Sequence, residues 1–186
     1  MKKDVLFESL EKNPVIAAVH EKEIDEAIQS PTEIIFLLKG NLLTIKSIID
    51  KVKNSNKLIF VHIDLADGIG KDRVGLEYIS KCGADGIIST RGNIIRQAKD
   101  MGLLTVQRFF ALDSKGVDSI FDMLSTTSPD LIEIMPGVIG KIINSFANEN
   151  VPLISGGLIE TKSEITNALN LGAIAVSTSK KELWYM

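Results

Sequence analysis

Cysteine and histidine, the residues that would indicate a disulfide or a metal site, are rare in this chain. Its 186 residues include one cysteine, Cys82, and two histidines. A single cysteine excludes an internal disulfide and a metal site built on paired thiolates. We expect Cys82 to be a small buried apolar residue, and we expect the protein to need no metal and no other cofactor.

Long apolar runs are missing as well. The runs at 34–38 and 58–61 end at Lys39 and His62, well before they reach the length of a membrane-spanning helix. Acidic residues follow the two N-terminal lysines, where a secretory signal would place its apolar stretch. These two observations predict a cytoplasmic protein.

Neither sign of charge dominates the composition. The net charge is −3 and the isoelectric point is near 5.5, so no overall positive field attracts nucleic acid. A hydrophobic content of 45% with 24% charged residues is typical of an ordinary globular protein, and the length fits one domain over 1–186. Any contact with RNA therefore has to come from a local patch.

The pattern that is present is a regular alternation of short β-branched runs with segments of helical apolar spacing. This alternation is typical of parallel strands joined by helices. We expect strands near 15–19, 33–38, 58–63, 86–89, 103–108, 130–135, 151–155 and 173–177. Helices are expected near 4–12, 21–29, 44–54, 73–81, 93–101, 114–126, 138–147 and 161–171.

Local signals support these boundaries. Thr161 and Glu164 have the spacing of a capping box at the start of a helix. Gly83, Gly102 and Gly172 stand where helices should stop.

Eight such units predict a single compact (β/α)₈ TIM barrel with an extra N-terminal helix outside the first strand and a truncated last helix. The N-terminal helix could cover the gap that the truncation leaves. An open doubly wound sheet is the alternative, but no glycine-rich dinucleotide fingerprint follows the first strand.

Two loops predict a phosphate site. In a barrel of this kind phosphate commonly binds between the loops that follow strands seven and eight. Gly156 and Gly157 lie in the first loop and allow backbone amides to approach an anion, while Ser177 and Thr178 end the last strand. A short helix from Lys180 should add the free amides of its first turn.

Ionisable residues end several other strands, at the rim where ligand contacts form. By strand alternation we expect Asp64 and Arg108 to point inward. Asp64, Arg108, Glu133 and Lys39 are the candidates for binding the rest of the ligand, with His62 beside them.

At these strand ends the chain resembles the glycerol uptake operon antiterminator family. The segments that carry the resemblance are 64–69 (DLADGI), 85–90 (DGIIST), 107–108 (QR), 112–114 (LDS), 133–137 (EIMPG), 155–159 (SGGLI) and 176–179 (VSTS). The resemblance runs almost end to end. It implies a glycerol-3-phosphate-responsive regulator, without catalytic residues, that binds the leader mRNA of a glycerol-metabolism operon and prevents transcription termination.

No recognised RNA-binding module accompanies this resemblance. Basic residues do occur in groups, and Arg91, Arg96 and Lys99 are the candidates for RNA contact. Other groups lie at Lys46, Lys51, Lys53 and Lys57 and at Lys180 and Lys181. A homo-oligomer is compatible with the sequence.

The alternative function is a TIM-barrel enzyme that acts on a small phosphate ester, of the isomerase, lyase or prenyltransferase type. Its acids and bases would be drawn from Asp64, His62, Lys39 and Glu133. The fold alone does not decide between the two, because this barrel supports many functions.

Overall fold

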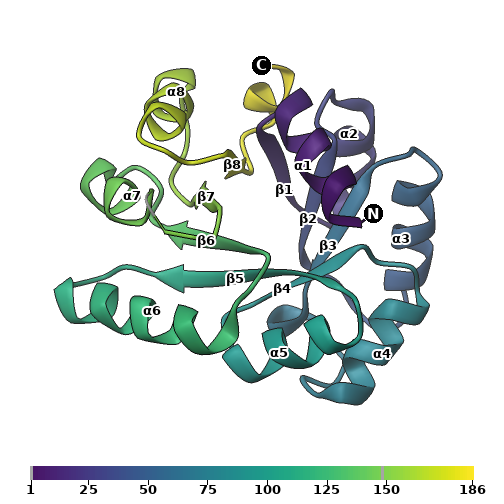
Figure 1. Ribbon diagram of the computed structural model, residues 1–186. Coiled ribbons are helices and arrows are strands. Elements are labelled where there is room, and N and C mark those ends of the chain that lie inside the picture. Colours follow the sequence, from purple (N-terminus) through teal and green to yellow (C-terminus); the bar gives the residue numbers. More distant parts are fainter. Residues whose placement is uncertain (1, 148) are drawn as a thin grey trace.

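The protein is a closed barrel of eight parallel strands, seen in a computed structural model that describes residues 2–147 and 149–186. Neighbouring strands pair in the order of the sequence, and the last strand pairs with the first (Figure 1). The strands are β1 (Val15–His20), β2 (Ile34–Lys39), β3 (Leu58–His62), β4 (Gly86–Ser89), β5 (Leu104–Phe110), β6 (Leu131–Met135), β7 (Leu153–Gly156) and β8 (Ala175–Thr178). The predicted barrel is therefore confirmed, and the open sheet is excluded.

Helices surround the sheet on its outer side, as Figure 1 shows. They are α2 (Ile24–Gln29), α3 (Ile45–Lys53), α4 (Arg73–Lys81), α5 (Gly92–Asp100), α6 (Ser114–Thr127), α7 (Gly140–Phe146) and α8 (Lys162–Asn170). Each lies within a few residues of its predicted range. The capping box at the start of α8 is confirmed, with Thr161 Oγ1 accepting from the Glu164 amide and the Glu164 carboxylate accepting from the Thr161 amide.

Strand alternation creates two apolar layers. On β3, Ile59 and Val61 face the helices and belong to the outer cluster, whereas Leu58 and Phe60 belong to the inner one. The interior positions near the C-terminal ends of β3, β5, β6 and β8 are polar instead of apolar. This change is what allows a site to form inside that end of the barrel.

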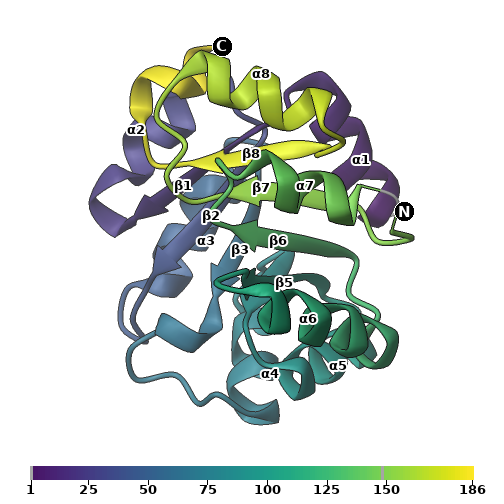
Figure 2. The ribbon, with the colours of Figure 1, turned by 90° about the vertical axis from the view of Figure 1, so that its left-hand side faces the viewer.

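The N-terminal helix α1 (Lys2–Lys12) forms as predicted, but its place differs from the prediction. Its Leu6 and Leu10 are buried in the inner cluster, so the helix packs under the barrel and not beside its first strand. Lys3 forms an ion pair with Asp130, just before β6, at 2.6 Å. Figure 2 shows α1 at one end of the barrel. The helix thus closes the end opposite to the one where ligands bind in this fold.

The truncated last unit is a short 3₁₀ helix, Lys181–Tyr185, after β8. Trp184 is 1% exposed, and its Nε1 donates to the Thr178 carbonyl at 2.9 Å. Leu183 and Trp184 are buried and fill the gap that was assigned to the N-terminal helix, whereas Tyr185 and Met186 are exposed. Within the described residues, no helix has the length and apolar character needed to cross a membrane.

Candidate ligand-binding site

A cavity of about 220 Å³ lies at the C-terminal ends of β7 and β8, where the sequence predicts the phosphate site. Strand residues form its inner end, and the loops after β7 and β8 form its mouth. The lining consists of Ala18, Leu38, Arg108, Met135, Gly157, Leu158, Ile159, Glu160, Ser177, Thr178, Ser179 and Lys180. This volume is below the range usual for drug-sized ligands and suits a small metabolite.

A buried ion pair forms the inner end of this cavity. Arg108 Nε donates to Glu133 Oε2 at 2.6 Å, and Ser177 Oγ donates to Glu133 Oε1 at 2.5 Å. The side chains of Arg108 and Glu133 are 7% and 0% exposed. The prediction that Arg108 points inward is confirmed, and Glu133 joins it because the two residues are register partners on β5 and β6.

His62 lies in the same polar interior, at the end of β3. Burial, followed by the nearby charge of Arg108, lowers the pKa of His62 from 6.5 to about 4. The imidazole is therefore uncharged at neutral pH. Its Nδ1 and the Nη2 of Arg108 are buried side-chain atoms without a hydrogen-bond partner in the described structure.

The two glycines after β7 have different roles. A Cβ on Gly156 would lie 2.6 Å from both Glu133 Oε1 and Ser177 Oγ, so the absence of a side chain there makes room for the Glu133–Ser177 hydrogen bond. Gly157 adopts a φ of +77° and lines the cavity mouth. Of the two, Gly157 is the one that lines the cavity.

The last strand contributes its two predicted residues in different ways. Ser177 reaches inward to Glu133, as described. Thr178 Oγ1 donates to the Ile159 carbonyl at 2.8 Å and accepts from the Lys180 amide at 3.1 Å, so this hydroxyl holds the two loops together. The Lys180 side chain lines the mouth and pairs with Glu160 at 3.3 Å. The mouth thus carries a partly exposed lysine; the sequence analysis assigned the amides that follow Lys180 to this site, but placed its side chain in a basic surface group.

Asp64 does not point into the cavity, contrary to prediction. Strand β3 ends at His62, and the 3₁₀ turn Ile63–Leu65 breaks the alternation that would have placed Asp64 inside. Its carboxylate accepts hydrogen bonds from Ser89 Oγ at 2.8 Å and from the Thr90 amide at 2.7 Å. Burial alone would raise the pKa of Asp64, but these hydrogen bonds hold it below its ordinary value.

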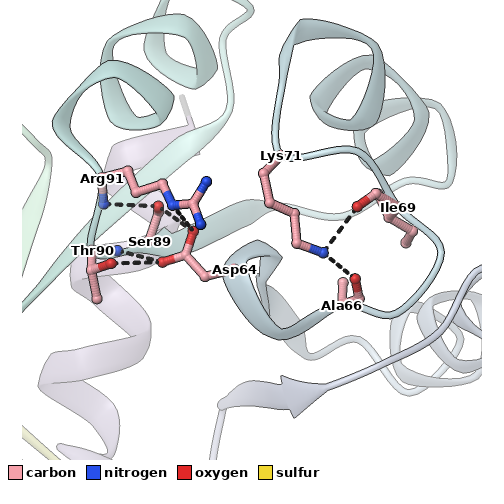
Figure 3. A network of polar contacts seen from close by, with 7 residues as sticks. All are labelled: Asp64, Ala66, Ile69, Lys71, Ser89, Thr90 and Arg91. Atoms are coloured by element: carbon pink, nitrogen blue, oxygen red, sulfur yellow. Dashed lines mark hydrogen bonds and ion pairs between the residues drawn. The ribbon is translucent and has the colours of Figure 1, made fainter.

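The Asp64 network, shown in Figure 3, organises the loop between β4 and α5. Thr90 Oγ1 adds a third hydrogen bond to the carboxylate at 3.0 Å, and Arg91 Nε lies 3.8 Å from it. On the preceding loop, the Lys71 ammonium donates to the Ala66 and Ile69 carbonyls. Asp64 is therefore a residue that positions a loop and Arg91 at the rim.

Lys39 also lies outside the cavity. On β2 the inward positions are Ile34, Phe36 and Leu38, so Lys39 faces away and pairs with Asp67 at 3.2 Å in a separate shallow hollow. Leu38 lines the cavity in its place. Strand alternation that starts from the inward Phe36 predicts that Leu38, and not Lys39, faces the cavity. The same alternation that starts from Glu133 predicts that Met135 lines the cavity, as it does.

The acids and bases of the enzyme alternative are consequently not assembled in one place. Lys39 and Asp64 are directed elsewhere, and Glu133 is held by Arg108 and Ser177. Among residues 2–147 and 149–186, no group of three or more His, Cys, Asp or Glu side chains could hold a metal ion.

The predicted basic groups differ in how far acids neutralise them. On α3, Lys46, Lys51 and Lys53 form ion pairs with Asp50, Asp25 and Asp85. On α5, Lys99 donates to the Ser128 carbonyl, and in the described part of the chain no ion pair joins Arg96 or Lys99 to a carboxylate. The α5 group therefore keeps more of its positive charge.

A known protein family matches almost the whole chain. Residues 15–184 match the family model described as glycerol-3-phosphate responsive antiterminator. The chain belongs to this family. The family is regulatory, which supports a regulator and not an enzyme.

Individual relatives extend the match. The chain is 36% identical over 183 residues to the uncharacterized protein YgcP of Escherichia coli K12, covering 96% of this chain and 95% of that protein. It is similar to the crystal structure of a glycerol uptake operon antiterminator regulatory protein from Listeria monocytogenes, with 31% identity, a TM-score of 0.88 and coverage of 92% and 95%. It is also similar to the crystal structure of a glycerol uptake operon antiterminator-related protein from Thermotoga maritima, with 33% identity and a TM-score of 0.84. That match covers 92% of this chain and 98% of the Thermotoga protein.

Solved aldolases also superpose on the chain, for example with a TM-score of 0.73 at 11% identity. At that level of identity the similarity reflects the shared barrel, which hosts many chemistries.

Proposed function

We propose that this protein binds glycerol 3-phosphate in the cavity and, in response, binds the leader mRNA of a glycerol-metabolism operon and prevents transcription termination. The observation that carries the proposal is the cavity itself. It combines a cation at its mouth, Lys180, with a buried polar inner end, in a chain that belongs to the antiterminator family. A small phosphate ester with hydroxyl groups has the matching two ends.

In the proposed complex the phosphate occupies the mouth. Lys180, which pairs with Glu160 at 3.3 Å in the structure, contacts the phosphate in place of that carboxylate, and the loop at Gly157 allows the close approach of main-chain amides. The glycerol hydroxyls then point toward Arg108 and Ser177 at the inner end. Glu133 contacts both of these residues and fixes their orientation.

The proposed RNA surface is the outer face of α5. Arg91 is the residue just before this helix, at the rim, and Arg96 and Lys99 follow on the helix toward the opposite end of the barrel. Lys2 lies beside Lys99 in a shallow hollow near the far end of this helix, whereas Lys3 in the same hollow is paired with Asp130. RNA affinity depends mainly on such rows of cations, because they displace the counterions of the phosphate backbone.

Calorimetry with glycerol 3-phosphate, followed by filter binding of the leader RNA with and without this ligand, tests the proposal. We expect saturable binding of the ester and tighter RNA binding in its presence. Turnover of a phosphate ester without any RNA binding would contradict the proposal and favour an enzyme.

The RNA surface has a test of its own. Replacing Arg91, Arg96 and Lys99 with glutamine should lower RNA affinity and flatten its salt dependence, by about 0.7 to 0.9 in log–log slope for each RNA phosphate that is no longer neutralised. The matched control replaces Lys46, Lys51 and Lys53 on α3, which removes the same charge from residues already paired with acids. Equal effects of the two triple variants would show that net charge, and not the α5 surface, is responsible.

A further inference from the structure

The buried ion pair at the inner end of the cavity has a consequence for ligand choice. We propose that the Arg108–Glu133 pair determines specificity, by accepting phosphate esters whose tail is an uncharged alcohol and rejecting those whose tail ends in a carboxylate. This inference rests on the proposed function, because it concerns the ligand of the same cavity.

The first step of the argument is that the Glu133 carboxylate is fixed in place. Arg108 Nε and Ser177 Oγ each donate to a different oxygen of it, at 2.6 and 2.5 Å. Gly156 leaves the space that the carboxylate occupies, since any Cβ there would lie 2.6 Å from Oε1. Two hydrogen bonds, one to each oxygen, thus hold the anion in this position.

The second step concerns charge. The guanidinium of Arg108 and the carboxylate of Glu133 cancel, and both are buried. His62 adds no charge at neutral pH, because burial and the neighbouring Arg108 hold its pKa at about 4. The inner end is thus electrically neutral overall. A ligand carboxylate placed there would lose its hydration and meet Glu133, and both effects disfavour binding.

The third step is the hydrogen bonding that remains available. Arg108 lines the cavity, and its Nη2 is buried without a partner in the described structure. An ionised carboxylate such as that of Glu133 still has acceptor capacity beyond its two present bonds. In the proposed complex a ligand hydroxyl enters the pair itself, where it accepts from Nη2 and donates to Glu133, two groups that are buried before the ligand binds. A ligand carboxylate only accepts, so it satisfies the arginine alone.

Two esters with the same three-carbon skeleton test the inference. Glycerol 3-phosphate ends in a primary alcohol, whereas 3-phosphoglycerate carries a carboxylate at that position. By calorimetry, we expect the wild-type protein to bind glycerol 3-phosphate at least about tenfold more tightly. Equal affinities, or a preference for 3-phosphoglycerate, would overturn the inference without using any variant.

Substitution of each partner should shift this ratio in opposite directions. Glu133→Gln removes the fixed anion and leaves the arginine charge uncompensated, so the preference should shrink by about tenfold or reverse. Arg108→Gln leaves the anion alone and should increase the preference. If Glu133→Gln folds and its ratio of affinities for the two esters equals that of the wild type, the inference is overturned. If Glu133→Gln does not fold, Arg108→Gln decides: a folded Arg108→Gln variant that prefers glycerol 3-phosphate no more strongly than the wild type overturns the inference.

Asp130→Asn is the matched control. Asp130 is a buried carboxylate just before β6, where it accepts from the Thr105 amide and hydroxyl at the opposite end of the barrel. Its neutralisation should leave the ratio unchanged. If the wild-type protein binds neither ester, the proposed ligand is wrong and this inference is overturned with it; binding of glycerol 3-phosphate without selectivity overturns the inference alone.

Discussion

At the scale of single residues, His62 gives a measurable dependence of stability on pH. Its pKa in the folded chain is about 4, against 6.5 for an ordinary histidine. Between these values the unfolded chain binds a proton that the folded chain does not, so the free energy of unfolding should fall as the pH drops from 6.5 to 4. The contribution is at most about 1.4 kcal/mol per pH unit.

Urea denaturation at several pH values checks this prediction. His62→Gln should show a shallower loss of stability with acid than the wild type. His20→Gln, which replaces the exposed histidine, is the control and should retain the wild-type slope. Parallel pH curves for the wild type and His62→Gln would contradict the prediction.

Gly157 allows a second prediction, because backbone and ligand effects can be separated. Its φ of +77° is unfavourable for other residues, and an added Cβ would lie 3.3 Å from Met135 Cγ. Gly157→Ala should therefore destabilise the fold by about 1 to 2 kcal/mol and also weaken ligand binding. Gly102→Ala is the control, since Gly102 has a similar φ of +74° but open space around it and lies far from the cavity. A reduced affinity in both variants would refute a specific role for Gly157.

Strand alternation predicts the orientation of a site residue only where the regular strand extends as far as that residue. Arg108 and Glu133 lie within regular strands, so their inward orientation follows from the sequence. Asp64 lies two residues past the end of β3, in a 3₁₀ turn whose geometry the apolar pattern does not report. The burial of His62 next to Arg108 is an interaction between distant strands and has no local signal.

At the scale of elements, helix α1 closes the end of the barrel opposite to the cavity. Leu6 is fully buried in the inner cluster of the barrel, although it lies on a helix that precedes the first strand. Leu6→Ala should lower the free energy of unfolding by about 3 kcal/mol, because it removes buried apolar surface and leaves a cavity behind. Val5→Ala, on the exposed face of the same helix, should cost much less.

Thermal or urea unfolding of both variants measures these effects. Because α1 and the cavity lie at opposite ends of the barrel, ligand affinity of folded Leu6→Ala should stay close to that of the wild type. A large drop in ligand affinity would show that helix α1 also affects the structure of the ligand site.

Element boundaries were predictable because the turn signals are local. The Thr161–Glu164 capping box starts α8, and Gly83, Gly102 and Gly172 all adopt positive φ values at helix ends. The position of α1 was not predictable in this way. Its apolar residues show that one face is buried, but the face against which it packs depends on closure of the barrel.

At the scale of the whole molecule, the proposed ligand site and the proposed RNA surface are separate. The cavity opens beside β7 and β8, whereas α5 follows β4. If the ligand strengthens RNA binding, thermodynamic linkage requires RNA to strengthen ligand binding by the same factor, typically about 5- to 150-fold. Calorimetric titration of the ester into free protein and into the protein–RNA complex measures this factor. An ester affinity that is the same with and without bound RNA would contradict the coupling.

The C-terminal 3₁₀ helix gives the molecule a spectroscopic property. Trp184 is the only tryptophan in the chain, and its indole is bonded to the carbonyl of Thr178, a residue that lines the cavity. Indole fluorescence responds to changes in polarity and hydrogen bonding, so the emission of the unmodified protein should report on the occupancy of the neighbouring loops. The protein thus contains a single tryptophan, beside its proposed effector site, and ligand titrations can be followed by selective excitation of its indole without a label.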